Sequence, residues 1–269
     1  MEELDYLIDY LINENDKISI NSKPTNLREK QDLYHALVNI RQPKDITDEY
    51  IHYEDKYLQK LLDDSIVTSC DDISLIDEIY PDNKLENGDK LAIWQGDITK
   101  LYVDAIVNAA NSRGLGCFVP LHRCIDNQIN TYAGIKLRLE CNEYMKSINY
   151  HLNTSEAFIT GAYNLPSNHI IHTVGPIITD SVTAEDKKLL EYCYINSLEL
   201  AKKYDIKNIA FPCISTGEFK YPKTDACKCV LKCVDKYLDD NRDSFDKIIF
   251  NLYTNEDVMI YERYIKENF

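Results

Sequence analysis

The sequence is short of positive charge: 30 lysine and arginine residues stand against 45 aspartate and glutamate residues, a formal net charge of −15 at pH 7. Because a phosphate backbone is bound by clustered cations, this balance excludes a general nucleic-acid-binding protein. A long apolar run is also missing, since none approaches the roughly 18 residues of a membrane-spanning segment. We therefore expect neither nucleic acid nor a membrane as a partner.

An export signal is missing as well. The chain opens on Met1-Glu2-Glu3, which is acidic where a secretory signal peptide is basic. The nine cysteines are an odd number at irregular spacing, which argues against a disulfide framework in a chain of 269 residues. We expect a cytoplasmic protein with reduced thiols, most of them small core residues. Internal repeats and low-complexity tracts are absent from the sequence.

The first 80 or so residues carry a helical pattern. Apolar residues recur there at the i, i+3, i+4, i+7 spacing of an amphipathic helix, first as Leu4, Leu7, Ile8 and Leu11. Further helices are predicted after Asn26, ending near Pro43, and from about Thr47. The stretch 81–89 is rich in turn residues and makes the best boundary. The pattern predicts a helical N-terminal extension over residues 1–85.

From residue 86 onward, short apolar segments alternate with longer helical patterns. This rhythm is typical of a mostly parallel sheet covered by helices, so the fold class of residues 86–269 is α/β. Strands are predicted at 91–94, 105–107, 158–160, 170–174, 209–213 and 248–252. Helices are predicted around 123–145, 184–204, 223–239 and 255–267.

Polar residues follow two of the predicted strands. Asp97 lies in a Gly-Asp-Ile-Thr segment, and Asn108 and Asn111 end the stretch Asp104-Ala-Ile-Val-Asn-Ala-Ala-Asn. Ligands of open α/β sheets bind beyond the carboxyl ends of the strands, where these side chains are expected. Asp97 suits an exocyclic amine of a purine, and the two asparagines suit ribose hydroxyls. The alternative is a helix cap at Asp97 and an ordinary polar loop at the asparagines.

A second segment has the ligand types of a metal site. Cys117, His122 and Cys124 are spaced C-x4-H-x-C, and zinc binds thiolate and imidazole in tetrahedral geometry. Three protein ligands would leave one position open for water or substrate, as in catalytic zinc sites. A closed structural site would need a fourth ligand, for which Cys141 and His151 are candidates. A chance grouping of two core cysteines with a surface histidine remains open at this point.

A third segment runs from a predicted strand into Ser215-Thr216-Gly217, with Glu218 and Phe219 next. Amides and hydroxyls in such a turn can bind a diphosphate, and the Phe219 ring can stack on a ribose. The alternative is a plain strand-to-helix loop in which Gly217 supplies a positive φ.

Together these segments resemble the macrodomain family, and specifically its zinc-dependent branch. The resemblance extends from Lys90 to about Leu238 and includes the stretch from His172 to Pro176. Its most specific part is the string Cys-Phe-x-Pro-x-His-x-Cys-Ile-Asp-Asn from Cys117, which replaces the glycine-rich tract of ordinary macrodomains. Residues 1–80 also look like the N-terminal extension of that branch, including Ala-Leu-Val-Asn-Ile-Arg-Gln-Pro at 36–43.

The resemblance implies a three-layer α/β/α macrodomain with a mixed central sheet, and one zinc ion per chain bound by Cys117, His122 and Cys124. It implies a hydrolase that removes mono-ADP-ribose from modified protein side chains and releases ADP-ribose. Asp97 and Ile98 would contact the adenine end and Asn111 the distal ribose, so Asn111 joins the three zinc ligands as a catalytic residue. The remaining implied ligand residues are Cys124, Ile125, Asp126, Ser215, Thr216, Gly217, Glu218 and Phe219.

One departure and two rival functions stay open. Asn130 stands where the family pattern has a histidine, which leaves its effect on rate or specificity undetermined. A reader module would bind ADP-ribose without cleaving it, and a related hydrolase would act on a small ADP-ribose derivative. A purely structural or redox zinc protein would not explain Asp97, Asn111 and the Ser215 turn together. The residues of the N-terminal helices do not distinguish a lid, a dimer surface and a docking site.

Overall fold

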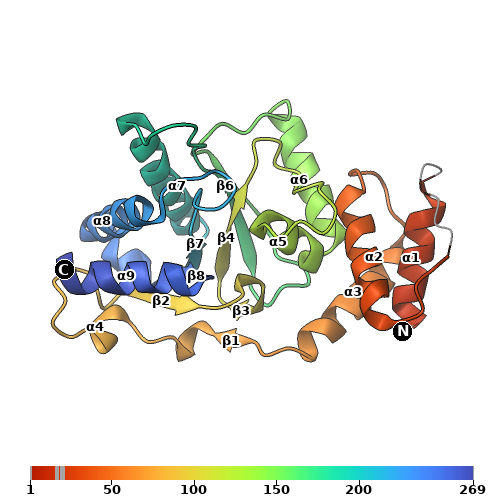
Figure 1. Cartoon of the computed structure of the whole chain (residues 1–269), viewed down its shortest axis with the longest axis horizontal. Helices are drawn as coiled ribbons and strands as arrows, with labels where there is room; N and C mark the ends of the chain where they lie inside the picture. The colour runs from red at the N-terminus through yellow and green to blue at the C-terminus, as the bar shows by residue number, and fades with distance from the viewer. Residues whose placement is uncertain (1, 16–17, 19–21, 269) are drawn as a thin grey trace.

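The computed structural model describes residues 2–15, 18 and 22–268. Its first three helices pack together at one end of the molecule, as α1 (Glu2–Asn13), α2 (Leu27–Ile40) and α3 (Asp48–Asp63) (Figure 1). The α1 stripe predicted from spacing is buried in their shared core. Asn26 and Thr47 cap α2 and α3, because their side chains accept hydrogen bonds from the amides of Glu29 and Tyr50. The predicted N-terminal helical region is confirmed.

A connecting segment then runs along the body of the molecule as β1 (Thr68–Ser69), the 3-10 helix η1 (Cys70–Asp72) and α4 (Ile76–Ile79). β1 pairs in parallel with β3 (Leu101–Tyr102). Ile76 and Leu85 are buried in the same core as the later helices α7 to α9. The segment thus packs on the body of the molecule, and the predicted boundary between residues 85 and 86 stays a prediction.

A six-stranded sheet forms the centre of the body, in the order β2-β8-β7-β4-β6-β5. β5 runs antiparallel to β6 and the other neighbouring pairs are parallel, so the sheet is mixed. Each strand lies at a predicted apolar segment. Their bounds are β2 (Leu91–Gln95), β4 (Ala105–Ala110), β5 (Ala157–Gly161), β6 (His169–Val174), β7 (Asn208–Pro212) and β8 (Lys247–Leu252).

Helices cover both faces of the sheet. One face carries α7 (Ala184–Lys203), α8 (Lys223–Asn241) and α9 (Asn255–Asn268), and the other carries α5 (Ile125–Ala133) and α6 (Ile135–Ser147) (Figure 1). Alternation along β4 serves both cores, because Ala105 and Val107 join the first and Ile106 joins the second. The three-layer α/β/α prediction is confirmed. The short helices η2 (Ile98–Lys100) and η3 (Arg242–Ser244) complete the described elements.

The predicted helical stretch 123–145 is two helices, and Gly134 separates them. Its φ of 89° lies in the left-handed region, and a Cβ at this position would lie 2.8 Å from Glu54 Oε2. The same Glu54 oxygen accepts a hydrogen bond of 2.7 Å from the Ile135 amide at the start of α6. A buried carboxylate from α3 therefore caps α6 and leaves room only for glycine before it. Within the described residues, no helix has both the length and the apolar character that a membrane crossing needs.

Candidate active site

The parallel strands end at one edge of the sheet, and the loops that leave them meet there. The β6–α7 and β7–α8 loops touch, because the Ile178 amide donates to the Phe219 carbonyl at 2.9 Å. A Cβ at Gly175 would lie 2.0 Å from Ser215 Oγ, so glycine is required where the two loops approach. The β4–α5 loop, with the Cys117 string, lies at the same edge. This is the position at which open α/β sheets bind ligands.

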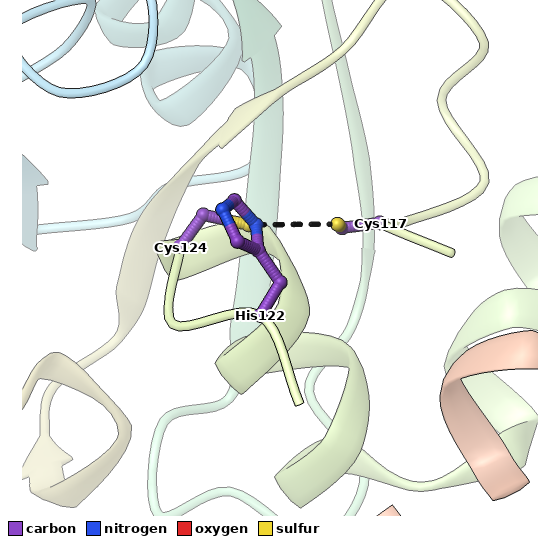
Figure 2. A group of neighbouring side chains, drawn as sticks. All are labelled: Cys117, His122 and Cys124. Atoms are coloured by element: carbon purple, nitrogen blue, oxygen red, sulfur yellow. Dashed lines mark hydrogen bonds between the residues drawn. The ribbon is translucent and has the colours of Figure 1, made fainter. Parts of the chain in front are cut away.

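The three predicted metal ligands come together. The ligand atoms of Cys117, His122 and Cys124 all lie within 4.8 Å of one another, and all three residues are half-buried. Figure 2 shows the Cys117 sulfur facing the His122 ring, and the distance from Sγ to Nδ1 is 3.5 Å. Tetrahedral zinc with bonds of about 2.3 Å to sulfur and 2.0 Å to nitrogen requires a similar separation, about 3.5 Å. The donor set and its spacing fit zinc.

The surroundings of Cys124 disfavour an unpaired thiolate. Burial raises the pKa of the Cys124 thiol to about 12, and the neighbouring Asp126 and Cys117 act in the same direction. Without a metal this thiol therefore stays protonated, and a metal ion that bound here would displace the proton and supply the positive charge that the thiolate needs. Within the part of the chain that the structure describes, the group contains neither Cys141 nor His151. Cys141 instead lies buried in α6, with Sγ 3.9 Å from His172 Nε2.

The metal cluster touches the loop predicted to bind the diphosphate. His122 Nε2 lies 3.5 Å from Glu218 Oε1, while Nδ1 faces Cys117. A carboxylate at Nε2 favours a proton on that nitrogen and leaves Nδ1 free to bind a metal, the arrangement common around metal-bound histidines. Two segments that are about 95 residues apart in sequence therefore meet at the site, and the sequence alone did not predict this contact.

Asp126 is the centre of a buried network beneath the cluster. Its carboxylate accepts hydrogen bonds from the side-chain amides of Asn108 at 2.8 Å, Asn111 at 3.0 Å and Asn130 at 3.1 Å. Burial raises the pKa of Asp126, and the hydrogen bonds from Asn108 and Asn111 oppose that rise together with the charge of Arg138. Asn130, where a histidine was expected, thus supports Asp126. It also lies directly under Gly116, whose Cβ would approach Asn130 Cγ to 2.6 Å.

The network continues into β6 through His172. Asn108 Nδ2 donates to His172 Nδ1 at 3.1 Å, so Nε2 carries the proton and donates to Thr160 Oγ1 at 2.9 Å. Burial lowers the pKa of His172 to about 3, which keeps the ring neutral. Asn108 is fully buried and its Nδ2 is committed to these two partners, while its Oδ1 has no partner among the described residues. The predicted contact of Asn108 with ribose stays a prediction.

Asn111 and Asp97 lie closer to solvent. Asn111 is half-buried and donates to the Gly116 carbonyl as well as to Asp126, so it braces the start of the loop. Asp97 is exposed and caps η2, because its Oδ1 accepts from the Thr99 amide at 3.0 Å and hydroxyl at 2.7 Å. The next residue, Ile98, is buried at 4% exposure. The cap expected as an alternative is present, and one Asp97 oxygen has no contact within that turn.

The β7–α8 loop has a strained residue at its centre. Ser215 has a positive φ of 67° and Lys220 one of 58°, whereas Gly217 does not, so the alternative of a left-handed Gly217 is wrong. The Tyr221 amide donates to the Ser215 carbonyl at 2.9 Å, and Thr216 Oγ1 donates to the Cys213 carbonyl at 2.9 Å. Ser215 Oγ is buried without a partner among the described residues. Strain and an unpaired hydroxyl in one loop are typical of ligand-binding sites.

The role of several residues around the site could not be predicted from the sequence. His35 and Asn39 of α2 and Arg138 of α6 contact the β4–α5 loop or the helix that follows it. Asn39 and His35 share one helix face, but a polar pair at that spacing is also common on solvated surfaces. Only the packing of α2 against α5 shows that they are buried or half-buried at this site.

Comparison with known proteins agrees with this geometry. The family model described as Macro domain matches residues 107–230. A protein-ADP-ribose hydrolase from Staphylococcus aureus (strain MSSA476) is 38% identical over 260 residues, which cover 96% of this chain and 93% of the relative.

Two solved structures share the fold. The Oceanobacillus iheyensis macrodomain with ADP has a TM-score of 0.60 and 35% identity, covering 68% of this chain and 93% of that one. The Trypanosoma brucei macrodomain in complex with ADP-ribose has a TM-score of 0.64 and 25% identity, covering 85% and 94%.

An α/β/α fold with polar loops gathered at the carboxyl edge of its sheet, matched along nearly its whole length by such a relative, defines a macrodomain. The chain therefore belongs to the macrodomain family. It is also a hydrolase, because its matched relatives include enzymes of that class along 96% of its length.

Proposed function

We propose that this hydrolase is zinc-dependent and removes mono-ADP-ribose from modified protein side chains, releasing ADP-ribose. The observation that carries the proposal is the Cys117, His122 and Cys124 set at the ligand-binding edge of the sheet, with its ligand atoms within 4.8 Å of one another. The substrate class is supported by the Staphylococcus aureus relative, named a protein-ADP-ribose hydrolase, and by the Trypanosoma brucei structure that holds ADP-ribose.

The ligand would lie across the loops of this edge. Asp97 and Ile98 would contact adenine, the Ser215–Phe219 loop would bind the diphosphate and the distal ribose, and Asn111 would contact that ribose near Cys124, Ile125 and Asp126. In support, His122 lies 3.5 Å from Glu218, which joins the metal loop to the diphosphate loop. The distal ribose, which carries the bond to be cleaved, would therefore lie next to the three metal ligands.

Zinc in this site would supply a Lewis acid that orients a ribose hydroxyl or lowers the pKa of a bound water. The chain's own residues fix the surroundings. Asp126 accepts from Asn111 and so limits the rotation of the amide that would contact the sugar. Glu218 lies 3.5 Å from His122 Nε2, on the side of the ring opposite to Cys117, and would help to orient the ring. Such preorganisation lowers the barrier because few groups must reorient during the reaction.

The experiment that tests the proposal is Cys117→Ala in the full chain. Loss of an interaction made in the transition state should lower ADP-ribose release from a modified protein by about a hundredfold or more, together with loss of zinc. Affinity for free ADP-ribose should fall by no more than about tenfold, because most of its proposed contacts, at Asp97, Ile98 and the Ser215–Phe219 loop, are made by protein groups and not by the metal. Cys233→Ala, which truncates a half-buried thiol in α8, is the control. It should leave both ADP-ribose release and affinity for free ADP-ribose unchanged.

Zinc content is measured by elemental analysis, binding by calorimetry, and folding by circular dichroism and thermal melting. A folded, metal-free Cys117→Ala protein that hydrolyses at the wild-type rate would show that the metal is structural. Wild type should be assayed on aspartate-, glutamate-, serine- and arginine-linked substrates. Tight binding of ADP-ribose with no release from any of them would replace the hydrolase with a reader.

A further inference from the structure

The loop with the three cysteine and histidine ligands is held in place partly by the N-terminal extension. Asn39, in the last turn of α2, is 1% exposed. Its Oδ1 accepts a hydrogen bond of 3.0 Å from the amide of Leu121, the residue before His122. Its Nδ2 donates at 3.0 Å to Thr131 Oγ1 in α5, the helix that begins directly after Cys124. One side chain of the extension thus connects the loop to the helix behind it.

The loop needs such a contact at Leu121. Leu121 has a φ of 56°, a left-handed conformation that is unfavourable for a residue with a Cβ. Its side chain is exposed at 45% and supplies little packing to offset this strain. The bond from its amide to the buried Asn39 is therefore a main restraint on the conformation that turns His122 toward Cys117.

Neighbouring contacts make the restraint rigid. His35, one turn earlier in α2, has Nε2 2.9 Å from Asn127 Oδ1, and Asn127 Nδ2 donates to the Val119 carbonyl at 3.0 Å. Because Asn127 gives its Nδ2 to Val119, its Oδ1 is the acceptor and His35 carries the proton on Nε2. Two points of the loop, at Val119 and Leu121, are thus tied to α2. Arg138 adds a third by donating to the Leu115 carbonyl at 2.9 Å.

We propose that Asn39 is a positioning residue of the metal site, and that the N-terminal extension completes this site. Asn39 sets the conformation of the 117–124 loop before any ligand binds and so brings Cys117, His122 and Cys124 within reach of one ion. The extension is a structural part of the active site, which accounts for its buried polar face on α2. The metal readout of this inference rests on the proposed zinc function, whereas the loop readout does not.

The test uses Asn39→Ala in the full chain, with zinc affinity measured by competition with a chromophoric chelator. Loss of a group that orients metal ligands typically lowers metal affinity by about 10- to 100-fold, and we expect a change in this range. Asn39→Asp keeps an acceptor for the Leu121 amide and should bind zinc within about threefold of wild type. With Co²⁺ in place of zinc, only Asn39→Ala should show an altered visible spectrum. The spectrum reports the geometry of the metal ligands, so this result would separate a change at the ligands from a change in the docking of the extension.

Gln59→Ala is the matched control. Gln59 is also an amide of the extension that bonds to the body, donating to the Asn164 carbonyl at 3.2 Å and to Asn164 Oδ1 at 3.1 Å, but it does not touch the loop. Gln59→Ala should leave zinc affinity unchanged within about twofold, since a residue outside the metal site orients its ligands only by touching them or their loop. Equal losses in Gln59→Ala and Asn39→Ala would show that docking of the extension matters and would overturn the role of Asn39.

Hydrogen exchange of the 117–124 segment in metal-free protein gives the second readout. The Leu121 amide should exchange at least about tenfold faster in Asn39→Ala than in wild type. Its exchange rate in Gln59→Ala should equal that of wild type. Should Asn39→Ala fail to fold, Asn39→Ser, too short to reach Leu121, replaces it. Wild-type protein that does not bind zinc would overturn the proposed function. Hydrogen exchange would still show whether Asn39 restrains the conformation of the loop. Unchanged zinc affinity and unchanged exchange in the folded variant would overturn this inference alone.

Discussion

The sheet separates two cores that bury different kinds of side chain. Under α7, α8 and α9 the core is built around aromatic rings, with Tyr194 stacked on Phe211 at 4.7 Å, and its cysteines pack as small apolar residues. Under α5 and α6 the core is interrupted by buried polar groups, among them Asp126, Arg138 and His172. The second core lies directly beneath the β4–α5 loop with the predicted metal ligands.

The difference shows what buried polarity does in this molecule. Burying a carboxylate, a guanidinium and an imidazole costs free energy that an apolar core would not require. Here each group is satisfied by hydrogen bonds that lead to the loop or to the residues around it. The first core thus contributes mainly stability, whereas the second exchanges some stability for a fixed conformation at the site.

The largest expected effect is that of Asp126→Ala. It removes one acceptor from each of three side-chain amides, those of Asn108, Asn111 and Asn130, and removes a negative charge that interacts with the buried Arg138. We therefore expect a loss of about 3–5 kcal/mol in the free energy of unfolding, measured with urea. Tyr194→Phe in the other core removes one hydrogen bond, from Tyr194 to the Pro212 carbonyl. It should cost only about 1 kcal/mol. Equal losses would erase the distinction between the cores.

The second-largest effect is expected in the pH dependence of stability, to which His172 in the polar core contributes. The folded state keeps His172 neutral, with its pKa lowered to about 3, while the unfolded state titrates near 6.5. Unfolded chains therefore bind more protons as the pH falls through 6.5, and stability declines toward pH 3. From pH 7 to pH 5 this group should remove about 2 kcal/mol. His172→Gln should lose less stability than wild type over that range in urea titrations; parallel curves would contradict the assignment.

Asp97→Ala should change binding more than folding, because Asp97 is exposed at the rim outside both cores. Loss of its proposed contact with adenine should weaken ADP-ribose binding by about tenfold, or 1.4 kcal/mol. Trp94, three residues earlier and packed over Gly96, is a convenient fluorescent probe. Asp97→Asn, which keeps an acceptor for the Thr99 amide, controls for the helix cap. Unchanged affinity in Asp97→Ala would remove Asp97 from the ligand site.

The smallest effect is expected for Cys227→Ala in the apolar core. Cys227 is fully buried in α8, so losing its sulfur should cost about 1 kcal/mol of stability through a small cavity. Zinc content and hydrolysis should equal those of wild type. A fall in zinc content would show that cysteines on this face also influence the metal site, and the contrast between the two faces would fail.

Much of the fold was predictable, because the signals that define it are local. Alternation and helical spacing located the six strands of the large sheet and the stripe Leu4, Leu7, Ile8 and Leu11 of α1. The break at Gly134 was missed, since it depends on Glu54 from a distant helix. The grouping of Cys117, His122 and Cys124 was predictable for the same reason of proximity, as the three lie within eight residues.

The supports of the site were not predictable, because they join residues far apart in the chain. Asn39 contacts Leu121 across 82 positions, and Arg138 contacts the Val38 carbonyl across 100. A single sequence gives no measure of such pairings, and a lone polar residue in a helix is compatible with a solvated face. The alternative of a left-handed Gly217 was also wrong, because Ser215 and Lys220 take the left-handed conformations of the β7–α8 loop, which glycine adopts more readily.

Arg138 has a consequence for how substitutions are tolerated at the junction of extension and body. Its guanidinium donates to the main-chain carbonyls of Val38, Asn39 and Arg41, the free carbonyl end of α2. Any residue at positions 38 and 41 supplies such a carbonyl, but only arginine reaches them from Nη1 while it donates to the Leu115 carbonyl from Nε. Mutational tolerance is therefore unequal across the junction. This contact does not restrict the side chains at positions 38 and 41, but it requires arginine at position 138.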